Sequence, residues 1–364
     1  MDEHEYSYLH ALNLVPQVGQ KTLRTLREHF GSFASVWEAN AGELAECGIF
    51  PPAVAALIEH RPHIDPEKEF AKLAQANIWM IAEDSDVYPE LLKEIPNPPA
   101  ALYGKGAVEA LTAHSIAIAL VGTRRTTRYG IEVAELLAHE LAEAGITVVS
   151  GLATGIDATA HTATLERKGT TIGILGSGLD RASFFPRENW NLSERIIKEN
   201  GVVVSEYPPG TPPLKEHFPQ RNRIVSGICK GIVVVEAREK SGALITARFA
   251  LEHNRQVFAV PGSIFSPTAR GANLLIQEGA KLILSTADIL VELGITPAAT
   301  LTATRDTLSE ADRMLLDLLE EPQTIDTLKQ AISGETAPLI ASLSLLELQG
   351  RVRNLGAGTY QRIM

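Results

Sequence analysis

Hydrophobic side chains between Tyr6 and about Arg61 recur at the three- or four-residue spacing of amphipathic helices, with polar residues between them. Glycines separate the helical segments, as is common at helix ends. The pattern predicts a small helical domain over residues 1–65.

From about residue 115 the pattern changes to short runs of apolar and β-branched residues that alternate with amphipathic helical segments. Such runs are apolar on both faces, which is typical of parallel strands covered by helices on both sides. We predict an α/β fold over residues 66–295, with an extended, Rossmann-like, doubly wound and mostly parallel sheet. The predicted strands are Ser115–Val121, Ile146–Ser150, Thr171–Leu175, Val202–Ser205, Ile232–Glu236 and Val257–Val260.

The last part of the chain predicts a second small domain. Residues 296–307 are rich in threonine and alanine and have little apolar periodicity, so we predict a linker there. Three helical segments then lead into a strand, a glycine turn and a second strand, an order typical of a winged helix, over residues 308–364. The third helix contains Glu335 and Glu347 but no lysine or arginine. DNA binding and protein contact therefore both stay open for this domain.

Composition restricts the possible functions. The chain has 33 basic and 44 acidic side chains and a net charge of −11, so it does not attract nucleic acid by bulk charge, and any such site must be local. Cys47 and Cys229 lie far apart, which excludes a disulfide scaffold and a cysteine-rich zinc site. The N-terminus is acidic and polar, and no uncharged apolar run reaches the ~18 residues of a membrane span. We expect a cytoplasmic protein without membrane contact.

Glycine-rich turns follow three consecutive predicted strands. In an open parallel sheet, ligands bind beyond the carboxyl ends of the strands, where loop N–H groups and helix N-termini attract anions. The three turns together therefore predict a site for a phosphate-bearing ligand. Their glycines are Gly122 after the first strand, Gly151 and Gly155 after the second, and Gly176 and Gly178 after the third.

Cations gather near the same edge of the predicted sheet. Arg124 and Arg125 follow the first strand, and Lys215–Arg223 combines three cations with an aromatic ring and an amide before a helix-like stretch, Ile224–Cys229. Single-stranded nucleic acid is held by such a mixture, because cations meet the backbone and rings stack on bases at ~1 to 3 kcal/mol per base. Ion pairs with surface carboxylates and a core position for the ring are the alternatives. The candidate contacts here are Lys215, Phe218, Arg221, Asn222 and Arg223, with Ser241 and Gly242 after a later strand.

One turn of the helical domain offers a further DNA contact. Leu14–Gly19 is similar to the turn of a helix-hairpin-helix, a motif that presents backbone N–H groups to a DNA phosphate. A helical turn in which Gly19 serves only as a cap is the alternative, and the sequence leaves both open.

Signatures of several enzyme classes are absent. The chain has no G-x-x-x-x-G-K-[ST] loop, and the glycines after the third strand have the wrong order for a dinucleotide fingerprint. Asp157 and His161 are four residues apart, but two ligands make no metal site, and Ser150 has no evident base. We predict no catalytic residues, no metal and no cofactor.

Ordered motifs run along nearly the whole chain, among them Val121-Gly122-Thr123-Arg124, Ser150-Gly151-Leu152-Ala153-Thr154-Gly155-Ile156-Asp157, Gly176-Ser177-Gly178-Leu179-Asp180, Phe218-Pro219-Gln220-Arg221-Asn222-Arg223 and Phe258-Ala259-Val260-Pro261-Gly262. With these motifs the chain resembles the DNA processing protein A family (DprA, also called Smf) of bacterial natural transformation. Two motifs depart from the family pattern: Phe185-Pro186 replaces Tyr-Pro, and Gly271-Ala272-Asn273 replaces Gly-Thr-Asn. Each loses a hydroxyl and neither loses a cation.

The resemblance implies a mediator and not an enzyme. It implies an extended Rossmann domain that binds and protects incoming single-stranded DNA, forms a homodimer and loads RecA, with single-strand-binding protein as a further partner. It also implies an N-terminal domain like a sterile-alpha-motif fold and a C-terminal winged helix. Family DNA contacts fall on Arg124, Lys215 and Phe218, whereas Arg221 and Arg223 are added from spacing and charge alone.

Two other function classes are weighed against the mediator. Related Rossmann-like domains hydrolyse nucleoside monophosphates as phosphoribohydrolases, but they carry a Pro-Gly-Gly-x-Gly-Thr loop where this chain has Pro261-Gly262-Ser263. An interaction role of the end domains alone leaves the cation-rich segments unexplained. We therefore favour single-stranded DNA binding.

Overall fold

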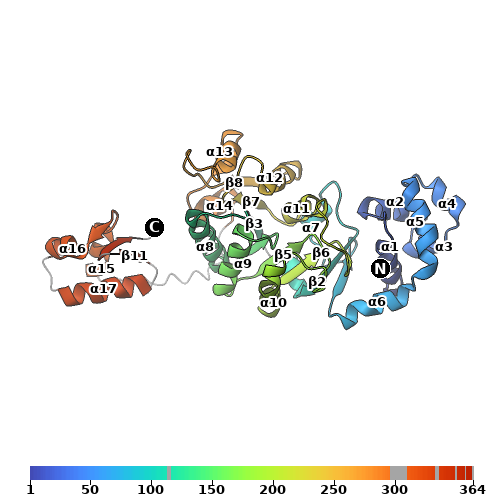
Figure 1. The fold of residues 1–364 in the computed structure, drawn as a ribbon, viewed down its shortest axis with the longest axis horizontal. Helices are drawn as coiled ribbons and strands as arrows, with labels where there is room; N and C mark the ends of the chain where they lie inside the picture. Colours follow the sequence, from blue (N-terminus) through green and yellow to red (C-terminus); the bar gives the residue numbers. More distant parts are fainter. Residues whose placement is uncertain (113–115, 296–309, 333–335, 349–350, 357, 363–364) are drawn as a thin grey trace. The chain divides into compact units, whose positions relative to one another are not determined.

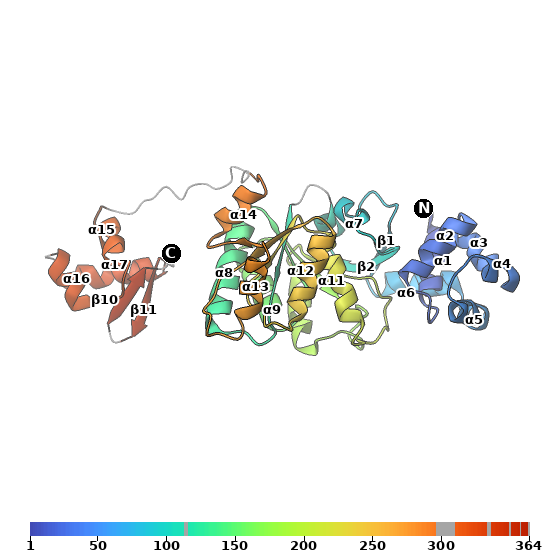
Figure 2. The same cartoon turned by 90° about the horizontal axis from the view of Figure 1, so that it is seen from above.

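The computed structural model describes residues 1–112, 116–295, 310–332, 336–348, 351–356 and 358–362 (Figures 1 and 2). The chain divides into two compact units, Met1–Ala298 and Ala299–Met364. The predicted linker over residues 296–307, and Glu335 of the last domain, lie outside the described residues. Among the described residues, no helix is long and apolar enough to cross a membrane.

The chain begins with a bundle of short helices. The Asp2 side chain accepts a hydrogen bond from the Glu5 N–H at 2.9 Å and caps the first helix, and Asn40 with Glu43 forms a capping box on the fourth. The buried core of the bundle is rich in leucine, in agreement with the helical spacing. The helices are α1 (Glu3–Asn13), α2 (Gln20–Phe30), α3 (Phe33–Glu38), α4 (Ala41–Glu46), α5 (Pro51–His60), the short 3-10 helix η1 (Arg61–His63) and α6 (Pro66–Gln75), whose Phe70 ring lies 6.3 Å from that of Tyr6 on α1.

A nine-stranded sheet follows within the same unit, in the order β1-β2-β6-β5-β4-β3-β7-β8-β9. Strand β2 pairs antiparallel with β1 and β6, and the other pairs are parallel. This mostly parallel, Rossmann-like sheet confirms the predicted fold class. The strands are β1 (Trp79–Ala82), β2 (Ala101–Gly106), β3 (Ala117–Val121), β4 (Thr147–Ser150), β5 (Thr171–Leu175), β6 (Val202–Ser205), β7 (Gly231–Val234), β8 (Gln256–Ala259) and β9 (Lys281–Leu282).

Helices cover both faces of the sheet (Figure 1). Because side chains alternate along a strand, Ile118 and Leu120 of β3 join the core beneath α8 and α9, and Ala119 and Val121 join the core beneath α11 and α12. The helical segments are α7 (Glu90–Lys93), η2 (Val108–Leu111), α8 (Arg128–Glu143), α9 (Ile156–Glu166), η3 (Arg187–Asn189), α10 (Trp190–Lys198), α11 (His217–Gly227), α12 (Gly242–Glu252), α13 (Arg270–Gln277) and α14 (Thr286–Glu292).

The strand order reverses beside β3. Strands β3 to β6 succeed one another in one direction across the sheet, and the chain then returns to place β7 on the other side of β3. The loops that follow β3 and β7 therefore diverge to opposite faces, and they leave a crevice at the carboxyl ends of these strands. This topological switch point positions the candidate site.

The second unit has the order of elements of a winged helix. Its short sheet has the order β10-β12-β11, and Leu316, Leu328, Leu343, Val352 and Tyr360 form part of its core. The elements are α15 (Glu310–Leu318), β10 (Gln323–Thr324), α16 (Ile325–Ile332), α17 (Thr336–Leu348), β11 (Val352–Gly356) and β12 (Thr359–Arg362).

Candidate functional site

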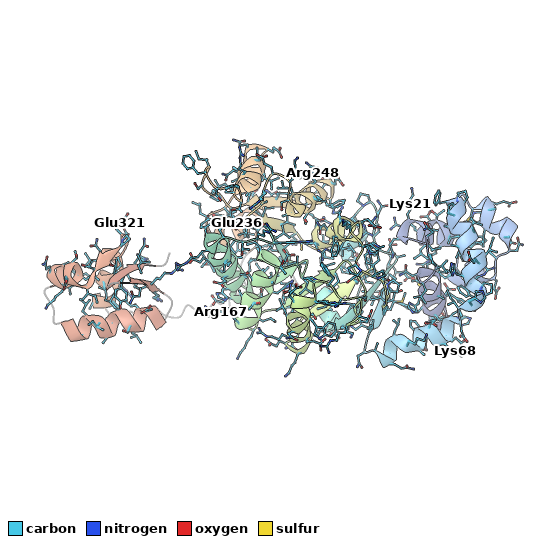
Figure 3. The ribbon with its side chains drawn as sticks, in the orientation of Figure 1. Lys21, Lys68, Arg167, Glu236, Arg248 and Glu321 are labelled. Carbon is cyan, nitrogen blue, oxygen red and sulfur yellow. The ribbon has the colours of Figure 1, made fainter. Side chains whose placement is uncertain are left out.

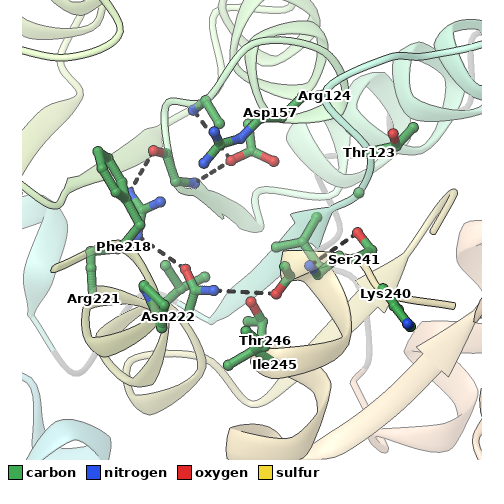
Figure 4. A pocket seen from close by; sticks show the side chains of 18 of the residues that line it. Thr123, Arg124, Asp157, Phe218, Arg221, Asn222, Lys240, Ser241, Ile245 and Thr246 are labelled. Atoms are coloured by element: carbon green, nitrogen blue, oxygen red, sulfur yellow. Dashed lines mark hydrogen bonds between the residues drawn. The ribbon is translucent and has the colours of Figure 1, made fainter. Parts of the chain in front are cut away.

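A cavity of about 610 Å³ opens at the switch point (Figure 4). The turns after β3 and β4 form one wall, and α11, the segment after β7 and the start of α12 form the other. Nine of the residues predicted from the sequence line this pocket: Gly122, Arg124, Gly151, Lys215, Phe218, Arg221, Asn222, Ser241 and Gly242.

The turn between β3 and α8 is fixed by Glu236, which follows β7 and is labelled in Figure 3. The buried Glu236 carboxylate accepts hydrogen bonds from the Thr127 N–H at 3.0 Å, the Thr127 hydroxyl at 2.7 Å and the Thr268 hydroxyl at 2.8 Å. Gly122 fits closely here, because a Cβ at this position would lie 2.6 Å from Cγ1 of Ile156. The turn is therefore rigid where it presents Arg124 to the pocket.

The turn between β4 and α9 is held by Asp157. Its carboxylate accepts hydrogen bonds from the N–H groups of Gly151 at 3.1 Å and Ala153 at 3.3 Å. Burial raises the pKa of Asp157, and the nearby charge of Arg221 acts against this shift. Gly155 has a φ of +84°, and a Cβ there would lie 2.4 Å from the Thr123 carbonyl oxygen. Asp157 and Gly155 thus fix the backbone of the turns that form this wall of the pocket.

Arg221 ties α11 to the sheet. Its guanidinium is buried, with 4 % of the residue exposed, and donates to the carbonyl oxygens of Gly151, at 2.5 Å, and Ile174. Burial lowers the pKa of Arg221 to about 10. Figure 4 shows this side chain directed at the β4 turn. Two of the three guanidinium nitrogens of Arg221, Nε and Nη1, thus donate hydrogen bonds within the protein.

Arg223 lies away from the pocket. The sequence placed Lys215–Arg223 before a helix, but α11 begins at His217, so positions 221 and 223 differ by about 200° around the helix axis. Arg223 donates to the buried Glu206 carboxylate at 2.7 Å. Two arginines that looked equivalent in the sequence thus point in different directions.

Four cationic side chains of the pocket have no ion pair with any residue that the structure describes: Arg124, Lys215, Arg238 and Lys240. Asp157, whose oxygens are directed at backbone N–H groups, is the one carboxylate among the residues that line the pocket. The pocket is therefore strongly positive, although the whole chain carries a net charge of −11.

Two aromatic rings, Phe185 and Phe218, line the pocket. The Phe185 and Phe218 ring centroids lie 5.6 Å apart at 60°, and the Arg124 guanidinium carbon lies 5.7 Å from the Phe218 centroid. Phe185 is 40 % exposed. Cations beside an accessible ring can engage phosphates and bases together.

Three residues of the pocket were missed by the sequence reasoning as DNA contacts. In the sequence, Phe185 stands out only as a departure from a family motif, and Arg238 and Lys240 belong to none of the cation-rich segments named above. The signal for the two cations was their position between the end of β7 and Ser241, at the edge where the other candidates lie.

The remaining predicted residues lie outside the lining of the pocket. Arg125 is exposed on the β3 turn, and Gly155 backs that turn. Gly176 lies beneath Phe218, where a Cβ would approach the ring to 3.2 Å, and Gly178 supports the loop of Asp180. The described residues contain no group of three or more histidine, cysteine or carboxylate side chains placed to bind a metal ion.

Comparison with known proteins accounts for this architecture. The sequence profile of DNA recombination-mediator protein A matches residues 79–294. The chain belongs to this family. The DNA processing protein DprA of Bacillus subtilis is 47% identical over 223 residues, which cover 61% of this chain and 74% of that protein.

Two solved structures of the family are similar to this one. The X-ray structure of DNA processing protein A from Streptococcus pneumoniae has a TM-score of 0.68 and 37% identity, and the match covers 80% of this chain and 99% of that one. DNA processing protein A from Helicobacter pylori, described for its single-stranded DNA binding mode, has a TM-score of 0.53 and 29% identity, covering 59% and 95%.

Proposed function

We propose that the pocket binds single-stranded DNA and that the chain acts as a recombination mediator. The observation that carries the proposal is that four unpaired cations and two partly exposed rings line one pocket, at the switch point of a chain that is acidic overall. The family membership and the single-stranded DNA binding of the Helicobacter pylori relative support it.

The proposed contacts divide by chemistry. The phosphates contact the four cations that have no ion pair with any described residue, Arg124, Lys215, Arg238 and Lys240. A base stacks on the rings of Phe218 and Phe185. The other predicted residues that line the pocket, Asn222 among them, shape it or donate locally. The Asn222 amide donates to the Gly242 carbonyl at 3.3 Å (Figure 4). Arg221 and Arg223 act inside the protein, and we leave them out of the contact set.

The chain binds its ligand and does not transform it, in this proposal. The Ser150 hydroxyl donates to the Leu120 carbonyl at 2.6 Å, and Asp157 is directed at backbone N–H groups. The Asp157 carboxylate also lies within hydrogen-bonding reach of the Ser150 hydroxyl, but Ser150 is fully buried and donates to a backbone carbonyl, so it is not placed to attack a ligand in the pocket. Release of free base from nucleoside monophosphates, in proportion to protein concentration, would favour the phosphoribohydrolase alternative.

The proposal extends to partners and cellular place. A recombination mediator delivers a bound strand to a recombinase, so the proposed recipient is RecA in the cytoplasm. Single-strand-binding protein is the proposed competitor for the strand. The proposed active form of the chain is a homodimer. Faster onset of RecA ATP hydrolysis on DNA coated with single-strand-binding protein would support this extension, and an unchanged onset would contradict it.

A salt titration tests DNA binding itself. Each phosphate contact on a single strand contributes about −0.7 to the slope of log affinity against log salt, so four contacts predict a slope of about −3. We expect this slope with oligo-dT and weaker binding to duplex DNA of equal length, because a duplex hides its bases from the rings. A flat response, or equal affinity for duplex, would overturn the proposal.

A further inference from the structure

The loop between β8 and α13, residues 260–269, exposes two large apolar side chains. Phe265 is 89% exposed and Ile264 is 78% exposed, and no other large hydrophobic residue that the structure describes is more exposed than Phe265. We call Pro261–Thr268 the rim loop. Adjacent apolar side chains held in water are a common mark of a contact surface.

The rim loop is anchored to the body of the protein. The Tyr129 hydroxyl donates to the Pro261 carbonyl at 2.8 Å, and the Asn273 amide exchanges hydrogen bonds with Gly262 at 3.0 and 3.2 Å. At its other end the Thr268 hydroxyl donates to Glu236, the carboxylate that also fixes the turn of Arg124. The loop therefore holds its two apolar side chains in a defined place, which lowers the entropy lost on binding.

The rim loop lies on the same edge of the sheet as the pocket. Strands β3, β7 and β8 are neighbours, and the rim loop follows β8 as the pocket turns follow β3 and β7. The Gly271 N–H, just beyond the rim loop, donates to the Ala237 carbonyl at 2.7 Å, beside Arg238. The segment that carries the unpaired cation Arg238 thus contacts the start of α13, the helix into which the rim loop leads.

We propose that the rim loop is a second stacking site for the same DNA strand. A strand whose base lies on Phe218 leaves the pocket past Arg238 and Lys240, which meet its phosphates, and a following base stacks on Phe265 with Ile264 beside it. The positive charge of this path favours a nucleic acid over an apolar protein segment as the occupant. This inference rests on the proposed function.

Dependence on oligonucleotide length tests the inference. Oligo-dT of about 6 nucleotides is short enough to occupy the pocket alone, and oligo-dT of about 20 nucleotides reaches the rim loop. Phe265→Ala is expected to weaken binding of the long strand about tenfold, the size of one lost stacking contact, and to leave the short strand unaffected. Phe50→Ala, which removes a 64% exposed phenylalanine from the helical bundle, is the matched control and should change neither affinity.

The outcomes separate this inference from the proposed function. Equal effects of Phe265→Ala on both lengths, or no effect on either, would overturn the second stacking site, while Arg124→Ala would still weaken the short strand. If Arg124→Ala instead left the affinity for both the short and the long oligonucleotide unchanged, the proposed function would be contradicted. A fall in the dimer fraction measured by light scattering, with DNA affinity unchanged, would assign Phe265 to a contact between copies and overturn the inference.

Discussion

Arg124 and Arg221 line the same pocket, but their guanidinium groups differ in exposure and in hydrogen-bond partners. Arg221 places its guanidinium against two backbone carbonyls, whereas Arg124 is exposed and has an aromatic ring as its described contact. A phosphate can displace water from Arg124 without breaking a protein hydrogen bond. At the residue scale, accessibility of the donors and not the presence of charge decides which cation can bind DNA.

Arg124→Ala should lose about one phosphate contact. We expect weaker binding to oligo-dT and a salt slope that is flatter by ~0.7, with the unfolding free energy unchanged because the side chain is exposed. Arg128→Ala is the control, since Arg128 is also exposed but pairs with Glu132 at 2.8 Å. Equal effects of the two substitutions would mean that general surface charge, and not the pocket, binds the strand.

The sequence predicted part of the lining of the pocket, and the DNA contacts of these residues stay a prediction. Arg124, Lys215 and Phe218 were predicted as contacts and do line the pocket. The roles of Arg221 and Arg223 could not be separated, because the direction of each side chain depends on where α11 begins. The helix starts at His217, seven residues before the predicted helix-like stretch that begins at Ile224. Phe185 was not predicted as a contact because a single phenylalanine has no periodicity that indicates exposure.

At the scale of elements, α11 forms one wall of the pocket and depends on Arg221 for its position. Removing one partner from a buried charged network typically costs 3 to 5 kcal/mol, because the other groups are left unsatisfied. We expect Arg221→Met to lower the unfolding free energy by about 3 kcal/mol in a urea titration. DNA affinity should fall as α11 shifts. Full stability with a selective loss of DNA affinity would show that Arg221 contacts the strand directly.

The six strands in the middle of the sheet, β6 to β8 in sheet order, were predictable from the sequence, and the three strands outside them were not. Strands β5 and β6 match their predicted bounds, because strands buried on both faces are continuous apolar runs. Strands β1, β2 and β9 were missed. Strand β9 has two exposed residues, and β2 contains Gly104 and Lys105, which hide its apolar character.

At the scale of the whole molecule, the net charge of −11 repels DNA and the pocket attracts it. Repulsion over the acidic surface limits non-specific binding, and the local positive potential directs a strand to one edge of the sheet. Added salt screens both effects, but the close phosphate contacts in the pocket dominate the change in affinity. Binding should therefore weaken as salt rises.

The stability of the whole molecule should depend on pH through His161. Burial lowers the pKa of His161 to about 3, while its unfolded value is near 6.5. Below pH 6.5 the unfolded chain binds a proton that the folded chain does not, so stability is lost as the pH falls toward 3, by at most ~1.4 kcal/mol per pH unit. His161→Gln should show a smaller difference in unfolding free energy between pH 7 and pH 5. An unchanged difference would mean that other groups determine this loss.

The central claim is that single-stranded DNA lies at the switch-point pocket, and photocrosslinking tests it most directly. Oligo-dT that carries a photoreactive uracil would be irradiated with the full-length protein, and the crosslinked peptides identified by mass spectrometry. The predicted result is crosslinking to the peptides of Phe218 and Phe185, abolished by excess unlabelled oligo-dT. Crosslinks confined to the helices of residues 3–63 or to the unit Ala299–Met364 would contradict it.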